Sequence, residues 1–148
     1  MKQLNARDNR SIYLVKLKHV PEKQFVLKKI VCGDEDTLKL TMSEVTTMNS
    51  LSHENLISSH CDMVENNPKM LPVFNILMDE FQATAQSRLT EVAKLPKKTQ
   101  LIEKLLILLQ CARGIRCLHS NGIMHRDISP DNIFLNLEDK KVTRVVLS

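Results

Sequence analysis

Apolar and polar residues alternate in short stretches near the N-terminus and recur at helical spacing further along the chain. The alternating stretches predict four strands, at residues 11–18, 24–31, 56–64 and 71–78. From Thr37 to Leu51 the apolar residues recur every three or four positions, which predicts a helix with one apolar face. A longer helix is predicted over residues 100–119, and a β-hairpin from 133–136 and 142–147. This order of elements indicates an α+β globular fold.

The ends of the two helices carry recognisable signals. Asp34 or Asp36 can cap the first helix, because a carboxylate before the first turn accepts its free amide hydrogens. Gly122 follows the long helix and suits the left-handed conformation in which many helices end. Residues 79–98 read as loop with a short helix, and 65–69 as a polar turn. Six residues make one apolar stripe along the long helix: Leu101, Leu105, Leu108, Ala112, Ile115 and Leu118.

The composition is that of one globular domain. The 148 residues are 43% hydrophobic but only 3% aromatic, so aliphatic side chains and methionine must fill the core. Lysine and arginine number 21 against 17 acidic residues, and the charges are interspersed. Because no basic run or basic-aromatic stripe is present, the sequence does not indicate a nucleic-acid partner.

The cysteines and the apolar runs indicate a cytoplasmic protein. Four cysteines form no C-x-x-C pair, which is typical of reduced thiols. The first ten residues contain no apolar core of a signal peptide, and the apolar runs are too short to span a bilayer. We therefore expect no membrane partner and a cytoplasmic location, with a nuclear or cytoskeletal location as the alternative.

The strongest chemical signal is the octet His-Arg-Asp-Ile-Ser-Pro-Asp-Asn at 125–132. Pro130 lacks an amide hydrogen and disfavours helix at Ser129, so Asp127 and Asn132 must share a tight loop. A carboxylate there can accept a proton from an attacking hydroxyl, and a carboxamide can hold a metal beside a phosphate. The alternative is an ordinary polar turn between a helix and a strand.

The octet resembles the H-R-D-x-x-x-x-N catalytic loop of protein kinases, and two other stretches agree. Residues 24–30 resemble the V-A-I-K strand of that family, with Lys28 as the lysine that holds the ATP phosphates. Residues 43–57 resemble the family's E-x-x-x-L-x-x-L-x-H-x-N-I stretch, with Glu44 as the anion that orients Lys28. Strand alternation points Lys28 and Lys29 to opposite faces, so only one of them can serve this site.

The resemblance implies an ATP site with Mg²⁺. Met78 would lie beside the adenine, and the backbone of Asp79 and Phe81 would hydrogen-bond the base. Three apolar side chains would enclose the ring: Ile12, Val26 and Phe134.

The resemblance also implies a truncated form of the two-lobed kinase fold. Residues 1–78 would form a small antiparallel-sheet lobe with one helix, 79–82 a hinge, and 83–148 the start of a large lobe. Asp127 would position or deprotonate the hydroxyl of a protein substrate, and Asn132 would bind Mg²⁺. Details of the motifs look most like the NIMA-related serine/threonine kinases.

Three departures from the kinase pattern bear on activity. Asn5, Arg7 and Arg10 stand where the glycine-rich loop has its glycines, which normally let backbone amides approach phosphate. Ser129 replaces a lysine that would touch the transferred phosphate. The sequence also ends where the Asp-Phe-Gly motif is due. The helix at 100–119 would then lack the later helices that cover it in the family, and its apolar stripe would be exposed. An exposed stripe predicts poor solubility or a partner.

These features lead to two expectations. The first is an ATP-dependent serine/threonine kinase domain, present as a fragment with little or no activity. The alternative is a pseudokinase or truncated regulatory or scaffolding module that binds nucleotide weakly, or a partner protein. A helical adaptor unrelated to kinases would require all these spacings to coincide by chance.

Overall fold

The computed structural model describes residues 2–7, 9–67 and 70–148, and it describes side chains outside 5–8 and 66–71. Part of the predicted turn at 65–69 therefore lies outside the described residues, as does Asp8 of the stretch aligned with the glycine-rich loop. The chain forms two compact units. The first comprises Met1–Ser52 and Ser58–Glu80, and the second comprises His53–Ile57 and Phe81–Ser148.

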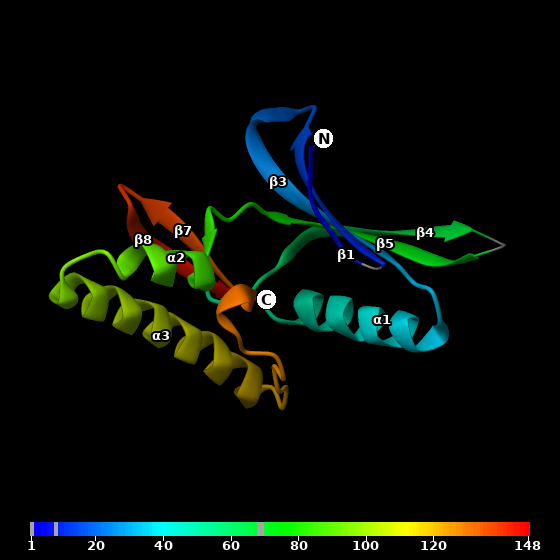
Figure 1. The fold of residues 1–148 in the computed structure, drawn as a ribbon. Coiled ribbons are helices and arrows are strands. Elements are labelled where there is room, and N and C mark those ends of the chain that lie inside the picture. Colours follow the sequence, from blue (N-terminus) through cyan, green and yellow to red (C-terminus); the bar gives the residue numbers. More distant parts are fainter. Residues whose placement is uncertain (1, 8, 68–69) are drawn as a thin grey trace. The chain divides into compact units, whose positions relative to one another are not determined.

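The first unit contains a five-stranded antiparallel sheet in the order β1-β2-β3-β5-β4 (Figure 1). Its strands are β1 (Lys2–Arg7), β2 (Arg10–Leu17), β3 (Val20–Val31), β4 (Ser59–Asn67) and β5 (Met70–Asp79). The polar strand β1 was not predicted, since an edge strand needs no apolar alternation to pair with its neighbour. The predicted strand at 56–64 begins too early, because Leu56 and Ile57 belong to the second unit.

Helix α1 (Glu35–Ser50) lies along one face of this sheet (Figure 1). Of the two predicted caps, Asp34 is the one that forms, with its Oδ1 accepting from the Thr37 amide at 2.7 Å. The hydrogen bonds from Thr37 lower the pKa of the Asp34 carboxyl, so the cap stays charged at neutral pH. Only Thr41 and Val45 of this helix are buried.

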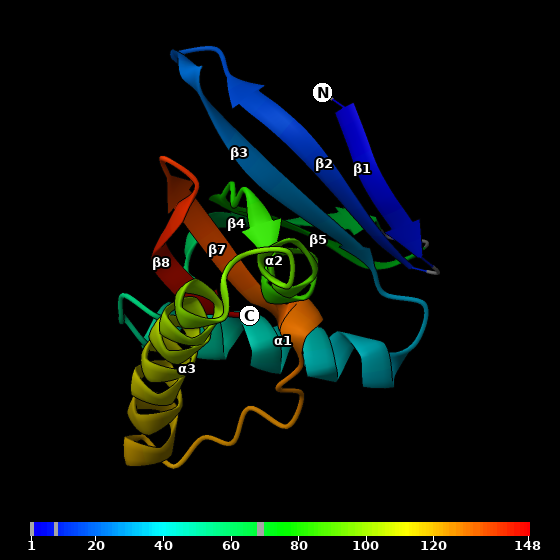
Figure 2. The same ribbon diagram turned by 60° about the vertical axis from the view of Figure 1, so that its left-hand side comes forward.

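The second unit contains a three-stranded sheet in the order β6-β7-β8, two helices and one turn of 3₁₀ helix (Figure 2). Its elements are β6 (Ala83–Thr84), α2 (Ala85–Val92), α3 (Lys97–Ser120), η1 (Pro130–Asn132), β7 (Ile133–Glu138) and β8 (Lys141–Leu147). The predicted long helix and terminal hairpin are confirmed, and so is the α+β class of the fold. Gly122 has φ +71°, as predicted for the residue that ends α3.

The face of α3 that packs is not the predicted apolar stripe. The buried positions of α3 are Glu103, Ile107, Cys111, Gly114 and Leu118. Of the stripe, only Leu118 is buried, while Leu101, Leu105 and Leu108 are more than half exposed. The expected exposure of the stripe is therefore observed. Because α3 is apolar on most of its sides, periodicity could not identify the face that packs. None of the helices in the described part of the chain combines the length and hydropathy that a membrane-spanning helix needs.

A buried asparagine holds the segment His53–Ile57 against α3 and β8. Asn55 is 2% exposed, and its Nδ2 donates to Gln110 Oε1 at 3.0 Å and to the Val145 carbonyl at 2.9 Å. The Leu147 amide donates to the Asn55 carbonyl at 3.0 Å. A Cβ on Gly114 would lie 2.7 Å from that carbonyl oxygen, so the helix approaches this closely only because residue 114 is glycine.

The close approach at Gly114 predicts that Gly114→Ala destabilises the protein by about 1–3 kcal/mol, the usual cost of overpacking a core. The added methyl group would meet backbone, which cannot rotate away as a side chain can. Urea unfolding of the purified chain measures the difference. Gly33→Ala is the matched control, because a Cβ at Gly33 meets nothing within 4 Å. Equal stability of the two variants would contradict the prediction.

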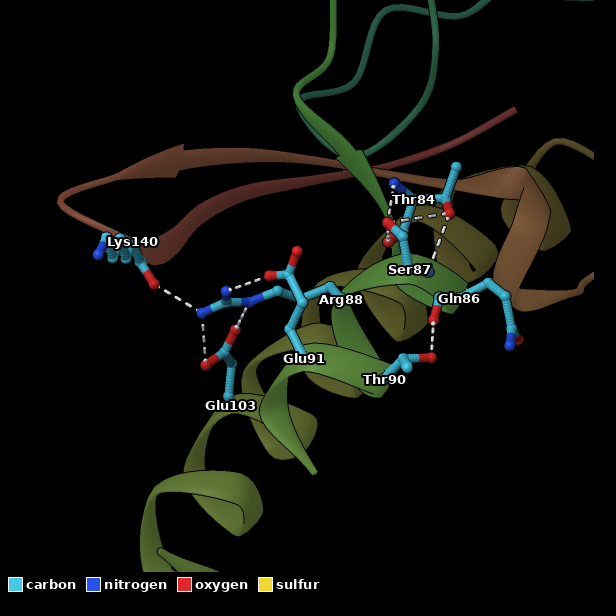
Figure 3. Close-up of polar contacts among 8 residues, drawn as sticks. All are labelled: Thr84, Gln86, Ser87, Arg88, Thr90, Glu91, Glu103 and Lys140. Atoms are coloured by element: carbon cyan, nitrogen blue, oxygen red, sulfur yellow. Dashed lines mark hydrogen bonds and ion pairs between the residues drawn. The ribbon is translucent and has the colours of Figure 1, made fainter. Parts of the chain in front are cut away.

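A buried ion pair joins α2 and α3 (Figure 3). Arg88 is 6% exposed and donates through Nη2 to Glu103 Oε2 at 3.1 Å and to the Lys140 carbonyl at 2.6 Å. Its Nε donates to Glu103 Oε1, and its Nη1 donates to Glu91 Oε2 at 2.9 Å. The hydrogen bond with Glu103 raises the pKa of the Arg88 guanidinium although burial opposes this. This pair was not predicted from the sequence, because arginine and glutamate on helices are usually solvated.

Removing one partner of this pair would leave a buried charge without compensation. Arg88→Ala is therefore expected to cost about 3–5 kcal/mol of unfolding free energy. Chemical denaturation measures it, and the double variant Arg88→Met/Glu103→Leu serves as the control. The double variant should lose less than Arg88→Ala, because it leaves no unpaired charge. A larger loss in the double variant would contradict this account.

Candidate active site

Lys28 and Glu44 form an ion pair within the first unit. Lys28 Nζ donates to Glu44 Oε1, and the lysine side chain is only 16% exposed. Lys29 lies on the other face of β3, with its Nζ 3.8 Å from Glu65 Oε2. The choice of Lys28 as the lysine partnered by Glu44 therefore agrees with the structure. A weakly solvated ammonium held by one carboxylate can be presented to a phosphate group.

Three of the predicted adenine contacts share a face of the sheet with Lys28. Ile12 on β2 is the cross-strand partner of Lys28, and residues directly opposite each other point to the same side. Val26 is two residues before Lys28 on β3 and therefore points the same way. Met78 on β5 is the cross-strand partner of Val26 and is 7% exposed. The register alone thus brings these four side chains to one face.

The side chain of Asp79, at the end of β5, is held by two polar partners. Its Oδ1 lies 3.0 Å from Lys23 Nζ and 2.8 Å from His60 Nε2. Burial by itself raises the pKa of the Asp79 carboxyl, but the hydrogen bonds from His60 and Lys23 outweigh it and leave that pKa below its usual value. The Phe25 ring packs edge-on against His60, with ring centres 5.3 Å apart. The backbone at the predicted start of the hinge is therefore tied to β3 and β4.

Asp127 and Asn132 meet in the octet loop of the second unit. Asn132 Nδ2 donates to Asp127 Oδ2 at 2.7 Å and to the Asp127 carbonyl at 3.1 Å. Pro130 begins the 3₁₀ turn η1, and the extended backbone of Ser129 before it follows the expected restriction. The carboxylate of Asp127 remains exposed to solvent, where it can meet an incoming hydroxyl. The sequence prediction that these two residues share one tight loop is confirmed.

Arg126 holds a conformation that is unusual for a residue with a side chain. Its φ is +66°, in the left-handed region. Such a conformation costs of order 1–3 kcal/mol and is found mainly where the surrounding structure requires it, often at functional sites. Here it bends the chain directly before Asp127.

Phe81 and Phe134, the other two predicted adenine contacts, lie together in the second unit. Their rings stack at 29°, with centres 5.6 Å apart. Phe134 also pairs through its backbone with Thr84 of β6. The segment after Asp79 is therefore held against β7 by an aromatic contact. Whether these rings and the residues of the first unit enclose a purine stays a prediction.

The residues of the loop fit part of a magnesium site. Mg²⁺ prefers carboxylate and carbonyl oxygens. The contact with Asp127 uses the amide nitrogen of Asn132, which leaves its carbonyl oxygen as the atom that can bind a cation. The described residues contain no group of three or more His, Cys, Asp or Glu side chains that could hold a metal ion. Within the described residues, the loop offers the Asp127 carboxylate and the Asn132 carbonyl oxygen as possible ligands of such a site.

Sequence reasoning missed several residues that make polar contacts near these groups. They are Lys23 and His60 around Asp79, and Asn49, Ser59 and Asp62 between α1 and β4. Lys23, His60, Asn49 and Asp62 are exposed and Ser59 is half-buried, and polar residues at such positions are common and usually solvated. Only the packing of elements that are separate in the sequence reveals their contacts.

Comparison with known proteins agrees with this geometry. Residues 11–146 match the family described as the protein kinase domain. The chain therefore belongs to the protein kinase domain family.

Its relatives include several mitogen-activated protein kinases. Human mitogen-activated protein kinase 4 is 26% identical over 79% of this chain, which covers 20% of that protein. Mitogen-activated protein kinase sty1 of Schizosaccharomyces pombe is 32% identical over 66% of this chain, which covers 26% of that protein. Mitogen-activated protein kinase mpkC of Aspergillus terreus is 34% identical over 66% of this chain, covering 24% of that protein. The chain thus spans about a quarter or less of the length of these three relatives. The resemblance to NIMA-related kinases finds no support among them.

The left-handed backbone of Arg126 predicts how this position tolerates substitution. Arg126→Val should destabilise the protein more than Arg126→Gly, because a β-branched residue is strained at positive φ and glycine is not. The expected difference in unfolding free energy is about 1–2 kcal/mol, measured by urea unfolding. A valine variant as stable as the glycine variant would show that the conformation at this position is not required.

Proposed function

We propose that this chain is the ATP-binding and catalytic-loop part of a serine/threonine protein kinase. The observation that carries the proposal is the Lys28–Glu44 ion pair on the sheet face that also bears Ile12, Val26 and Met78. Lys28 would hold the α- and β-phosphates of ATP, and Glu44 would keep its ammonium in place. The backbone of Asp79 and Phe81 would hydrogen-bond the adenine.

The proposed role of the catalytic loop rests on Asp127 and Asn132. The exposed Asp127 carboxylate would orient or deprotonate the hydroxyl of a protein substrate. Asn132 would contribute its amide oxygen to Mg²⁺, and bound Mg²⁺ would neutralise phosphate charge. Pro130 in the octet favours serine or threonine over tyrosine as the acceptor. A cytoplasmic location is part of the proposal.

Little or no phosphotransfer is proposed for the 148-residue polypeptide itself. It contains no Asp-Phe-Gly tripeptide and lacks the glycines of the phosphate-binding loop. In their place is the edge strand β1, which pairs with β2 across Asn5–Ile12 and Arg7–Arg10. Ser129 supplies no positive charge beside the transferred phosphate.

Mg-ATP binding tests the proposal. Lys28→Met should weaken binding by roughly 10- to 100-fold, because hydrogen bonds to a charged group contribute about 1.5–3 kcal/mol. Titration calorimetry and ATP-induced thermal stabilisation both measure this. Lys29→Met is the matched control, since Lys29 faces Glu65 on the other side of the strand.

The outcomes separate the parts of this proposal. Equal loss of binding in Lys28→Met and Lys29→Met would contradict the assignment of Lys28. No ATP binding by the wild-type chain would contradict the nucleotide site. Robust phosphotransfer that is lost in Asp127→Asn would show that the polypeptide is active after all.

A partner-binding or regulatory module is the second candidate function. The observation that favours it is the solvent-exposed apolar side of α3, where Leu101, Leu105 and Leu108 are 59%, 54% and 64% exposed. Exposed apolar surface of this kind marks a site that another chain segment or protein covers. A chain that binds no ATP but remains folded would favour this candidate.

A further inference from the structure

Helix α1 is held on its sheet by few apolar contacts. Thr41 and Val45 are its buried residues, while Leu40 and Met42 are 71% and 53% exposed. Leu38 and Met48 lie on the same side of the helix as the two buried residues and are only half-buried, so the apolar contact of α1 is narrow. Polar contacts must therefore contribute to the placement of Glu44, which lies in the middle of α1.

Three polar residues tie the last turn of α1 to β4. Asn49 Oδ1 accepts from Ser59 Oγ at 2.6 Å, and Asn49 Nδ2 donates to Asp62 Oδ1 at 2.8 Å. A carboxylate can only accept, so the amide nitrogen must face Asp62 and the amide oxygen the hydroxyl. We name these three residues the Asn49 clasp.

The clasp and the ion pair hold α1 at two different points. Asn49 follows Glu44 by five residues, which is roughly 140° around the helix and about 7.5 Å along its axis. Two ties at different angles and heights fix both the rotation and the axial position of a helix. The clasp also joins the two chain segments that flank His53–Ile57, which belongs to the other unit. Without it, the C-terminal end of α1 would lose its side-chain ties to β4.

We propose that Asn49 is a positioning residue that keeps Glu44 paired with Lys28. It contacts neither member of the pair and acts only through the placement of α1. Its consequence for ATP affinity rests on the proposed function, whereas its effect on the ion pair does not.

A donor–acceptor exchange tests the clasp directly. Asn49→Asp removes the amide donor and places a second carboxylate beside Asp62, so the clasp should open. Adding Asp62→Asn restores a donor opposite the new acceptor, and the hydroxyl of Ser59 can still donate to it. The rate at which an amine-specific acylating reagent labels Lys28, read by mass spectrometry, reports the ion pair. Lys28 is shielded from such a reagent while it is paired and 16% exposed.

Asn49→Asp should raise the labelling rate of Lys28 about 5-fold, the change expected for loss of one net hydrogen bond. Glu44→Gln should raise the rate by at least as much, and combining it with Asn49→Asp should add little. The exchanged pair Asn49→Asp/Asp62→Asn should return the rate to near wild type. The hydrogen-exchange rates of the α1 amides should rise in Asn49→Asp and return to near wild type in the exchanged pair.

Ser50→Ala is the matched control. The Ser50 hydroxyl bonds only to the Thr47 carbonyl of its own helix among the described residues, so its loss frays the same turn without touching β4. It should leave Lys28 labelling unchanged. If Ser50→Ala raised the labelling rate of Lys28 as much as Asn49→Asp does, the effect of Asn49→Asp would be explained by fraying of the helix end. That result would overturn the inference.

Two further outcomes would overturn the inference. In the first, Asn49→Asp shows wild-type labelling of Lys28 and wild-type hydrogen exchange of α1. In the second, adding Asp62→Asn to Asn49→Asp does not return the labelling rate of Lys28 toward wild type. Mg-ATP titration of the same variants forms a separate arm, in which Asn49→Asp should weaken binding about 5-fold and the exchanged pair should restore it. If the wild-type chain binds no ATP, the proposed function fails, and the labelling result still decides the role of Asn49.

Discussion

The packing of Asn55 is the constraint on which the second unit depends. Its buried amide donates to Gln110 and Val145, and its carbonyl accepts from Leu147, so one residue joins α3, β8 and the segment His53–Ile57. A buried amide nitrogen without such acceptors would be strongly unfavourable, so these two hydrogen bonds favour this arrangement of the backbone. Gly114 makes it possible, because any larger residue would keep the helix away. The octet loop at 125–132 directly follows α3, so the contacts that place this helix also place the start of the loop.

Polar pairs rather than broad apolar faces place the candidate functional groups. Glu44 reaches Lys28 from a helix with two buried side chains, and Asn132 holds Asp127 within an exposed loop. Contacts of this kind are specific in geometry but contribute modest free energy individually. The position of these groups therefore responds readily to changes in charge or hydrogen bonding nearby. In a member of the protein kinase domain family, that sensitivity lies where nucleotide and substrate would be handled.

The Lys28–Glu44 and Asp127–Asn132 pairs of the candidate site could be predicted from the sequence, and the polar contacts around them could not. The spacing from Asp127 to Asn132 and the motifs around Lys28 and Glu44 are local patterns, each visible within a short stretch. The Asn49 clasp and the Arg88–Glu103 pair join residues 10 to 15 positions apart on different elements. Their members are ordinary polar residues, and nothing in a local pattern separates a buried or bridging polar residue from a solvated one.

The sequence by itself determined the two longest helices, the terminal hairpin, the left-handed Gly122 and the tight loop at Pro130, and it narrowed the cap of α1 to Asp34 or Asp36. These features depend on pattern, propensity and sterics within a few residues. Tertiary structure decided which side of α3 packs. Apolar residues occur on several sides of that helix, so hydropathy alone did not single out one face. The face carrying Gly114 and Glu103 was selected because it allows a close backbone approach and completes a buried ion pair with Arg88. Both reasons involve partners distant in the sequence.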